Sequence, residues 1–191
     1  MLAAMKQPLL LAAGVSAAFL LSFGSTSAAV LVLGSGDPGL CSHAAMNPGA
    51  TAGGLHACDA ALKDPDLSSH DRAATFVNRG VLRLRGAAYD RAVEDFNSAL
   101  RINPQLGEAL VNRGAARIGQ HRYADALRDL ERGADLGASE PEKAWFNRGL
   151  AHEGLGDLPA AYRAYQRAAA LKPGWDAPQK ELARFTVRPA H

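Results

Sequence analysis

Residues 145–149 read Trp-Phe-Asn-Arg-Gly, and the tripeptide Asn-Arg-Gly also occurs at 78–80 and 112–114, with spacings of 34 and 35 residues. A motif that returns at a fixed interval of this length is typical of a repeat array, in which every unit is one set of packed elements. The interval predicts that the middle of the chain is built from stacked copies of one structural unit.

A longer frame of small, bulky and proline residues surrounds every copy of the tripeptide. Its members are Phe76, Gly80, Ala92, Phe96, Ala99 and Pro104 in the first copy, Leu110, Gly114, Ala126, Leu130, Gly133 and Ala138 in the weaker second, and Trp145, Gly149, Ala161, Tyr165, Ala168 and Pro173 in the third. Small residues allow two helices to approach closely, whereas proline lacks an N–H donor and ends a helix. The frame therefore predicts paired helices.

This frame resembles the tetratricopeptide repeat (TPR), a helix-turn-helix unit of 34 residues, from Ala73 to Pro173. The resemblance implies an all-α fold, an α-solenoid of three TPR helix-turn-helix repeats with capping helices at both ends. The units are expected at 73–106, 107–141 and 142–175. Their first helices are expected at about 71–85, 107–119 and 142–154, and their second helices at about 89–101, 123–136 and 158–171.

The flanking segments predict caps for the two ends of the array. Residues 55–72 are expected to form an N-terminal capping half-repeat whose helix covers 55–62, and residues 176–191 a capping helix followed by a tail. Ser68 with Asp71 forms a capping-box pattern, and Asp157 with Pro159 marks another helix start.

Residues 1–28 have the order of a secretory signal peptide. Lys6 precedes an apolar run over 8–23 and a small-residue stretch over 24–29, so cleavage is expected after Ala28 or Ala29. The run is shorter than the roughly 20 residues that span a bilayer, so no stable membrane insertion is expected after cleavage. We expect an exported, periplasmic bacterial protein with a flexible mature N-terminus over 29–54.

Cys41 and Cys58 are the only two cysteines. An even number in an exported chain predicts a disulfide, which would contribute about 3 kcal/mol for a loop of this size. Two reduced, half-buried thiols are the alternative, and a zinc site is the least favoured because no further Cys or His stands at ligand spacing.

Nucleic-acid binding and enzymatic activity are not expected. The formal charge is only +2, and no run of Lys and Arg forms a basic patch. Gly34–Gly39 spells G-x-G-x-x-G, but no second strand-like run follows, so a nucleotide-binding enzyme is a remote alternative. No catalytic or metal-binding motif is present, and we expect no cofactor.

In TPR families the first helices line a concave groove that holds a peptide or a partner helix. One helical stripe faces this groove by resemblance, and its expected members are Val77, Val81, Leu84, Val111, Ala115, Ile118, Phe146, Leu150 and Glu153. Peptide-carboxylate clamps in this family use Lys and Asn on the stripe. Because the stripe here is mostly apolar, an apolar peptide or amphipathic helix is the expected ligand.

The repeated asparagines Asn78, Asn112 and Asn147 match those that form a ladder along the bound peptide in some TPR families. An amide offers both a donor and an acceptor, so it can pair with any peptide bond. The equally weighted alternative is that each asparagine satisfies a helix end or faces water.

Basic residues stand where the family pattern has Leu and Tyr: Arg79 with Arg83, Arg113 with Arg117, and Arg148 with His152. They could form an anion-binding stripe, but internal pairing with Asp95 and Asp129 is favoured because a half-buried arginine needs a partner. Arg148 has Ala164 at that place and would be unpaired. The third repeat is therefore the expected place of a functional acidic contact.

The predicted function is that of a protein-protein interaction adaptor or assembly factor that binds a protein or peptide partner in the groove. The alternative is a self-contained structural protein whose own residues 30–33 fill the groove. The sequence leaves the partner and the oligomeric state open.

Overall fold

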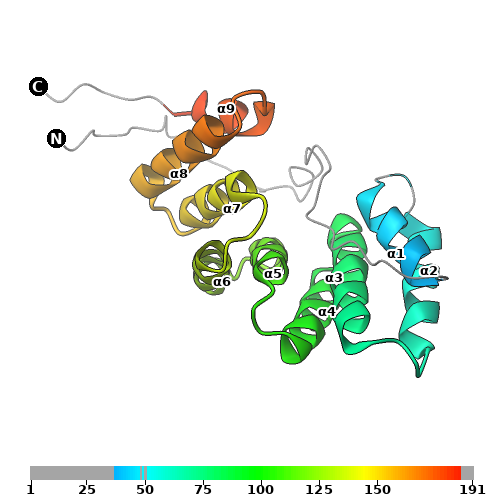
Figure 1. The fold of residues 1–191 in the computed structure, drawn as a ribbon. Coiled ribbons are helices and arrows are strands. Elements are labelled where there is room, and N and C mark those ends of the chain that lie inside the picture. The colour runs from blue at the N-terminus through cyan, green and yellow to red at the C-terminus, as the bar shows by residue number, and fades with distance from the viewer. Residues whose placement is uncertain (1–36, 48, 50, 186–191) are drawn as a thin grey trace, which may run out of the picture.

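The computed structural model describes residues 37–47, 49 and 51–185, and the regular elements in this part of the chain are all helices (Figure 1). They are α1 (Asp37–Met46), α2 (Thr51–Lys63), α3 (Ser69–Arg85), α4 (Tyr89–Ile102), α5 (Gly107–Gly119), α6 (Tyr123–Asp135), α7 (Pro141–Gly154), α8 (Leu158–Leu171) and α9 (Asp176–Leu182). The six helices of the three expected repeats begin and end within two residues of the predicted positions.

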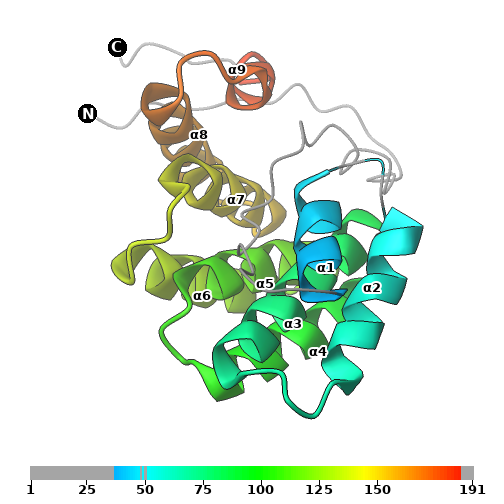
Figure 2. The same ribbon diagram turned by 45° about the vertical axis from the view of Figure 1, so that its right-hand side comes forward.

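The helices pack as a row of hairpins that runs from α1 and α2 at one end to α8 and α9 at the other (Figures 1 and 2). Each first helix contacts its own second helix, and each second helix contacts the next first helix. Successive first helices also touch, as α1 with α3, α3 with α5, and α5 with α7. Successive second helices are in less contact than successive first helices. The first helices therefore lie closer together and form the inner side of the array.

A glycine on the first helix of each repeat faces a large, fully buried side chain on the second. The three pairs are Gly80 with Phe96, Gly114 with Leu130, and Gly149 with Tyr165. A Cβ atom placed on Gly80 would lie 2.6 Å from the Phe96 ring, which is closer than carbon atoms pack. The glycine therefore permits the close approach of the two helices, as the repeated frame predicted.

Helix α1 corrects the expectation of a flexible segment over 29–54. Residues 37–46 and 51–54 lie in helices, whereas 29–36, 48 and 50 lie outside the described residues, as does the expected signal peptide. The half-repeat expected from residue 55 is thereby replaced by a complete helix pair, α1 with α2.

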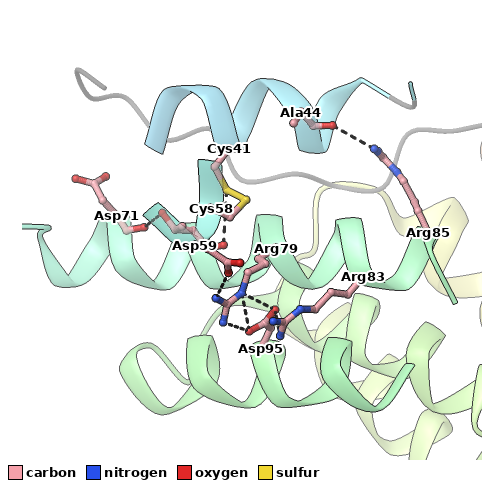
Figure 3. Close-up of a disulfide and its surroundings, with 10 residues drawn as sticks. Cys41, Ala44, Cys58, Asp59, Asp71, Arg79, Arg83, Arg85 and Asp95 are labelled. Carbon is pink, nitrogen blue, oxygen red and sulfur yellow. Dashed lines mark hydrogen bonds and ion pairs between the residues drawn. A yellow bond between two sulfur atoms is a disulfide. The ribbon is translucent and has the colours of Figure 1, made fainter. Parts of the chain in front are cut away.

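Tertiary contacts explain why α1 forms. Cys41, Ala44 and Ala45 are buried against Leu82 of α3. The Cys41–Cys58 disulfide, with an S–S distance of 2.10 Å, joins α1 to α2, as the cysteine count predicted (Figure 3). At the other end of α1, the Arg85 guanidinium donates to the carbonyl oxygens of Ala44, at 3.4 Å, and of Ala45 (Figure 3). The helix C-terminus thereby gains partners for its exposed acceptors.

Two predicted helix starts are confirmed by side-chain caps. The Asp71 N–H donates to Ser68 Oγ at 3.1 Å and begins α3, and the Ala160 N–H donates to Asp157 Oδ1 at 3.1 Å and begins α8. The C-terminal helix α9 covers the end of the array, where the Phe146 and Trp175 rings pack at a tilt of 54° with their centroids 5.0 Å apart. Helix α9 ends at Leu182, whereas the sequence from Asp176 to Phe185 was expected to form the capping helix.

Within residues 37–47, 49 and 51–185, the structure contains no helix with the length and apolar character needed to cross a membrane.

Replacement of Gly80 by alanine is expected to lower the free energy of unfolding by about 2 kcal/mol. The overpacking cost of about 3 kcal/mol against the buried Phe96 ring outweighs the ~1 kcal/mol that alanine contributes in a helix. Urea unfolding followed by circular dichroism measures the change. Gly86→Ala is the matched control, because its Cβ would meet its nearest atoms at 3.6 Å. Equal losses of stability in the two variants would refute the close-approach argument.

Candidate protein-interaction surface

The predicted stripe lies on the inner helices α3, α5 and α7, and its members differ in exposure. Buried members are Val77, Val81, Val111, Ile118 and Phe146, whereas Leu84, Ala115, Leu150 and Glu153 are half-buried. The buried members pack into three clusters, each of which draws on the helices of a repeat and its neighbour. Periodicity thus identified one face of each helix, but in this structure only half-buried members of that face are accessible.

The three repeated asparagines are buried, with exposed fractions of 0% for Asn78 and 6% for both Asn112 and Asn147. The alternative in which they face water is therefore not what the structure shows. Their contact with a bound peptide stays a prediction.

Arg79 and Arg83 of α3 hold the buried Asp95 of α4 between them (Figure 3). The Arg79 Nη2–Asp95 Oδ1 distance is 2.7 Å and the Arg83 Nη1–Asp95 Oδ2 distance is 2.8 Å. Arg79 also reaches Asp59 of α2 at 2.6 Å, which links the repeat to the preceding helix pair. Burial raises the pKa of the Asp95 carboxyl despite the opposing effect of the two arginines.

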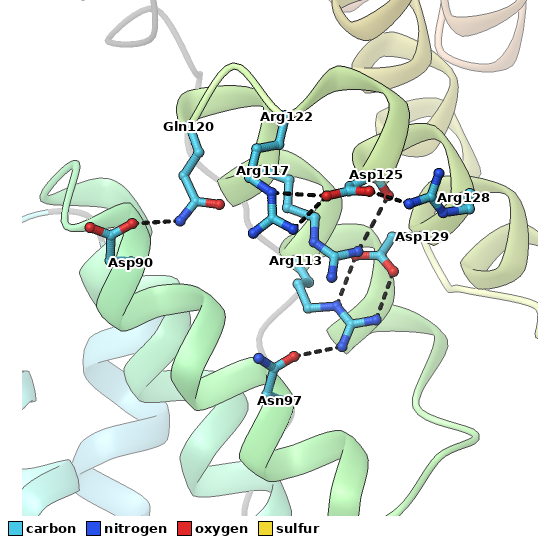
Figure 4. Close-up of polar contacts among 9 residues, drawn as sticks. All are labelled: Asp90, Asn97, Arg113, Arg117, Gln120, Arg122, Asp125, Arg128 and Asp129. Atoms are coloured by element: carbon cyan, nitrogen blue, oxygen red, sulfur yellow. Dashed lines mark hydrogen bonds and ion pairs between the residues drawn. The ribbon is translucent and has the colours of Figure 1, made fainter.

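The second repeat contains the same arrangement (Figure 4). Asp129 accepts from Arg113 at 2.7 Å and from Arg117 at 2.6 Å. Arg113 also donates to the side-chain oxygen of Asn97 on α4 at 2.6 Å. The predicted pairing of Arg79 with Asp95 and of Arg113 with Asp129 is confirmed, and the structure adds a link from each arginine to the preceding second helix.

The third repeat departs from this arrangement, because Ala164 stands where the first two repeats have an aspartate. The Arg148 guanidinium carbon lies 4.3 Å from the centroid of the Trp145 ring, and its Nη2 lies 3.9 Å from Glu131 Oε1. The expectation of an unpaired Arg148 is thus corrected, since its guanidinium makes a cation–π contact and a long ion pair with the exposed Glu131.

Glu153 was expected on the binding stripe, but in the structure its carboxylate bonds to side chains of α8 and of the C-terminal cap. Its two carboxylate oxygens accept from the Tyr165 hydroxyl at 2.9 Å and from Arg184 at 2.8 Å. Arg184 also pairs with the buried Glu181 of α9. Burial and the neighbouring Glu153 carboxylate raise the pKa of Tyr165. These contacts could not be predicted from the repeat, because α9 is a shorter helix than the first helices and does not follow their pattern.

No group of three or more His, Cys, Asp and Glu in the described part of the chain has the geometry of a metal site. Asp37–Gly39, the described end of the glycine-rich motif, begins helix α1. Neither of the two helices that follow is succeeded by a strand, which the βαβ unit of a dinucleotide site requires.

The variant Asp95→Asn is expected to lower the free energy of unfolding by about 2–3 kcal/mol. Loss of the carboxylate leaves Arg83 without its charge partner and Arg79 with only the half-exposed Asp59. This remaining partner, and the exposure of 16% and 19% of the two arginines, place the cost at the lower end for buried pairs. Urea unfolding of full-length protein measures it. Asp125→Asn is the control, because Asp125 pairs with Arg122 and Arg128 at the surface and should have a much smaller effect. A loss as small as that of the control would contradict the proposed stabilisation.

Stability is expected to fall as the pH drops below about 6.5, the pKa of an unperturbed histidine, partly through His152. Burial lowers the pKa of His152, with a further lowering by Arg148 and Arg163 that Asp157 and Glu131 oppose. The unfolded chain therefore binds the proton at higher pH than the folded chain. The free energy of unfolding falls as the pH drops from about 6.5 through the lowered pKa of His152. The variant His152→Gln should reduce this pH dependence in urea unfolding curves. An unchanged dependence would show that His152 does not contribute.

Comparisons with known proteins agree with the repeat. Residues 142–175, the span expected for the third unit, match the family model described as tetratricopeptide repeat. The Hsp70-Hsp90 organizing protein of Triticum aestivum is 34% identical over 97 residues, which make up 50% of this chain and 16% of that protein. The heat shock protein sti1 homolog of Schizosaccharomyces pombe is 35% identical over 80 residues, or 41% of this chain and 13% of that protein. The chain therefore spans less than a fifth of these relatives.

Solved structures show the same arrangement of helices. MamA from Desulfovibrio magneticus RS-1 superposes with a TM-score of 0.62 at 21% identity, over 79% of this chain and 84% of that one. The second TPR domain of human RPAP3, solved in complex with the HSP70 peptide SGPTIEEVD, gives a TM-score of 0.55 at 25% identity, over 61% of this chain and 97% of that one. The repeated frame, the paired helices and these similarities together show that residues 37–47, 49 and 51–185 form an all-α helical solenoid with the fold of tetratricopeptide repeats.

Proposed function

We propose that the protein is a non-enzymatic adaptor or assembly factor that holds an apolar peptide or an amphipathic helix of a partner on the inner face of the array. The observation that supports this most is the row of contacting first helices α1, α3, α5 and α7. A row of this kind presents one side of every repeat to the same ligand. Binding of peptides by the similar TPR domain of human RPAP3 is a precedent for such a use of the fold.

The composition of the stripe favours an apolar ligand over a terminal carboxylate. Its half-buried members Leu84, Ala115 and Leu150 have no charge, and the charged member Glu153 is engaged by Tyr165 and Arg184. No lysine stands on the stripe to hold a carboxylate. Apolar side chains of the partner would gain about 25 cal/mol for each Å² buried against these residues.

We further propose that the protein works outside the cytoplasm, in the bacterial periplasm. The Cys41–Cys58 disulfide supports an oxidising compartment, because such bonds are rare where thiols are kept reduced. The signal-like order of residues 1–28 supports the same compartment.

A test of the ligand class uses full-length protein and a fluorescent, leucine-rich amphipathic helical peptide. Fluorescence anisotropy should show saturable binding that Leu150→Ser weakens about tenfold, as expected when an anchor residue is lost at an interface. Leu171→Ser is the matched control, because Leu171 is 39% exposed on the second helix α8 and lies off the stripe. Equal weakening by both variants would contradict binding on the stripe.

The peptide SGPTIEEVD distinguishes a carboxylate clamp from the proposed mode. Forms with a free and with an amidated C-terminus should bind within about twofold of each other, because no stripe lysine is available to pair with the terminal carboxylate. A free form that binds much more tightly would replace the proposed ligand class by a clamp.

The rival in which the chain fills its own groove is tested by removal of residues 29–36. This deletion ends before α1 begins at Asp37, so the helix pair and its disulfide remain. An increase in affinity for the amphipathic peptide would support the rival, and an unchanged affinity would support an open stripe.

A further inference from the structure

The third repeat lacks the carboxylate that neutralises the basic pair in the first two. Asp95 and Asp129 each lie within 2.8 Å of two guanidinium groups from the adjoining first helix. Ala164 occupies the equivalent place on α8. Helix α8 contains Arg163 and Arg167 and no acidic residue at all, whereas α4 and α6 each contain several.

Basic residue types are retained around Ala164, with guanidinium groups as the cations, since burial lowers the pKa of His152. Arg148 and His152 of α7 lie one helical turn apart, as do the arginine pairs of the other repeats. Arg163 stands next to Ala164 on α8, the helix that packs against α7. We call Arg148, His152 and Arg163 the third-repeat basic cluster.

Nearby carboxylates in the described chain neutralise this cluster only weakly. Glu131 Oε1 lies 3.9 Å from Arg148, and Asp157 Oδ2 lies 3.8 Å from His152 Nδ1. Both carboxylates are more than half exposed, at 67% and 53%. Ion pairs with carboxylates this exposed to water contribute little free energy, unlike the buried contacts at Asp95 and Asp129.

The Trp145 ring restricts the position of the Arg148 guanidinium, which favours binding of an anion. The guanidinium carbon lies over the ring, 4.3 Å from its centroid, and this cation–π contact restricts the side chain. The N–H donors of a guanidinium lie in its plane and point away from its edges. The contact with Trp145 therefore holds the guanidinium of Arg148 in place, and its in-plane donors suit a carboxylate, which accepts two parallel hydrogen bonds.

We propose that the third-repeat basic cluster binds an Asp or Glu side chain of a protein partner, which completes in trans the ion pair that Asp95 and Asp129 complete within the chain. A carboxylate is the fitting anion because the same frame of residues already holds one twice in this molecule. An extended polyanion such as nucleic acid fits less well, since the chain has a formal charge of only +2 and no basic run. The site is distinct from the apolar stripe, and its existence does not depend on the proposed ligand of that stripe.

The test uses isotope-labelled full-length protein and a peptide of six glutamates with acetylated and amidated ends. The chain has two tryptophans, so its indole N–H groups give two separate NMR signals. Titration should shift the Trp145 signal and leave that of Trp175, which packs against Phe146 at the C-terminal cap, in place. Arg148→Gln should weaken binding about tenfold, the effect of a lost charge-assisted hydrogen bond.

Arg167→Gln is the matched control, because it removes the same charge from the exposed side of α8, one turn beyond Arg163. It should change the affinity by less than about twofold. Equal weakening by Arg148→Gln and Arg167→Gln would show diffuse attraction to basic charge and would overturn the proposal. Tighter binding of a single-stranded oligonucleotide than of the peptide would overturn it as well.

A second variant supplies the missing carboxylate within the chain. Ala164→Asp should pair with Arg148, raise the midpoint of thermal unfolding and abolish the Trp145 shift on addition of the peptide. Undiminished peptide binding by a folded Ala164→Asp protein would overturn the proposal. If the buried position does not accept aspartate, the comparison of Arg148→Gln with Arg167→Gln decides. Leu150→Ser should leave binding of the glutamate peptide unchanged, so failure of the stripe and failure of the basic cluster are distinguishable.

Discussion

The close approach of the two helices within each repeat is the constraint on which the rest of the structure depends. Gly80, facing the Phe96 ring, leaves no room for a Cβ atom, and the same holds at Gly114. This contact fixes the register of the two helices. Because an arginine precedes each glycine and an aspartate precedes Phe96 and Leu130, the same register brings the charges together. One small residue thus sets both the packing and the ion pair of a repeat.

In the N-terminal helix pair, a disulfide bond holds the two helices close together. Cys41 and Cys58 are 17 residues apart and fully buried, and the glycine of each repeat stands 16 residues before its large partner. The disulfide therefore joins the two helices near the place where a side chain packs on a glycine elsewhere. Helices α1 and α2 are rich in alanine and offer little apolar area, so a cross-link that restricts the unfolded chain is an effective substitute.

The sequence predicted the elements that depend on local or repeated signals. The helix limits, the caps at Ser68 and Asp157, and the pairing at Asp95 follow from turn chemistry and from spacing. Helix α1 could not be predicted in this way, because its sequence shows no amphipathic pattern and the stabilising contacts come from Leu82 and Arg85, far along the chain. The exposure of the stripe residues could not be predicted either. Periodicity identifies which face of a helix they share, but not how much of that face the neighbouring helices cover.

A repeat protein makes departures from its own pattern unusually informative, because every repeat is an internal control for the others. In the first two repeats the arginines need a buried carboxylate, and the chain supplies it. The third repeat keeps the first arginine as Arg148, has the Trp145 ring beneath it and lacks the aspartate. If the basic pair served stability alone, loss of the aspartate would favour loss of the arginine too, since an uncompensated half-buried charge costs free energy. Retention of Arg148 on an aromatic ring is better explained by a carboxylate that arrives from outside the chain.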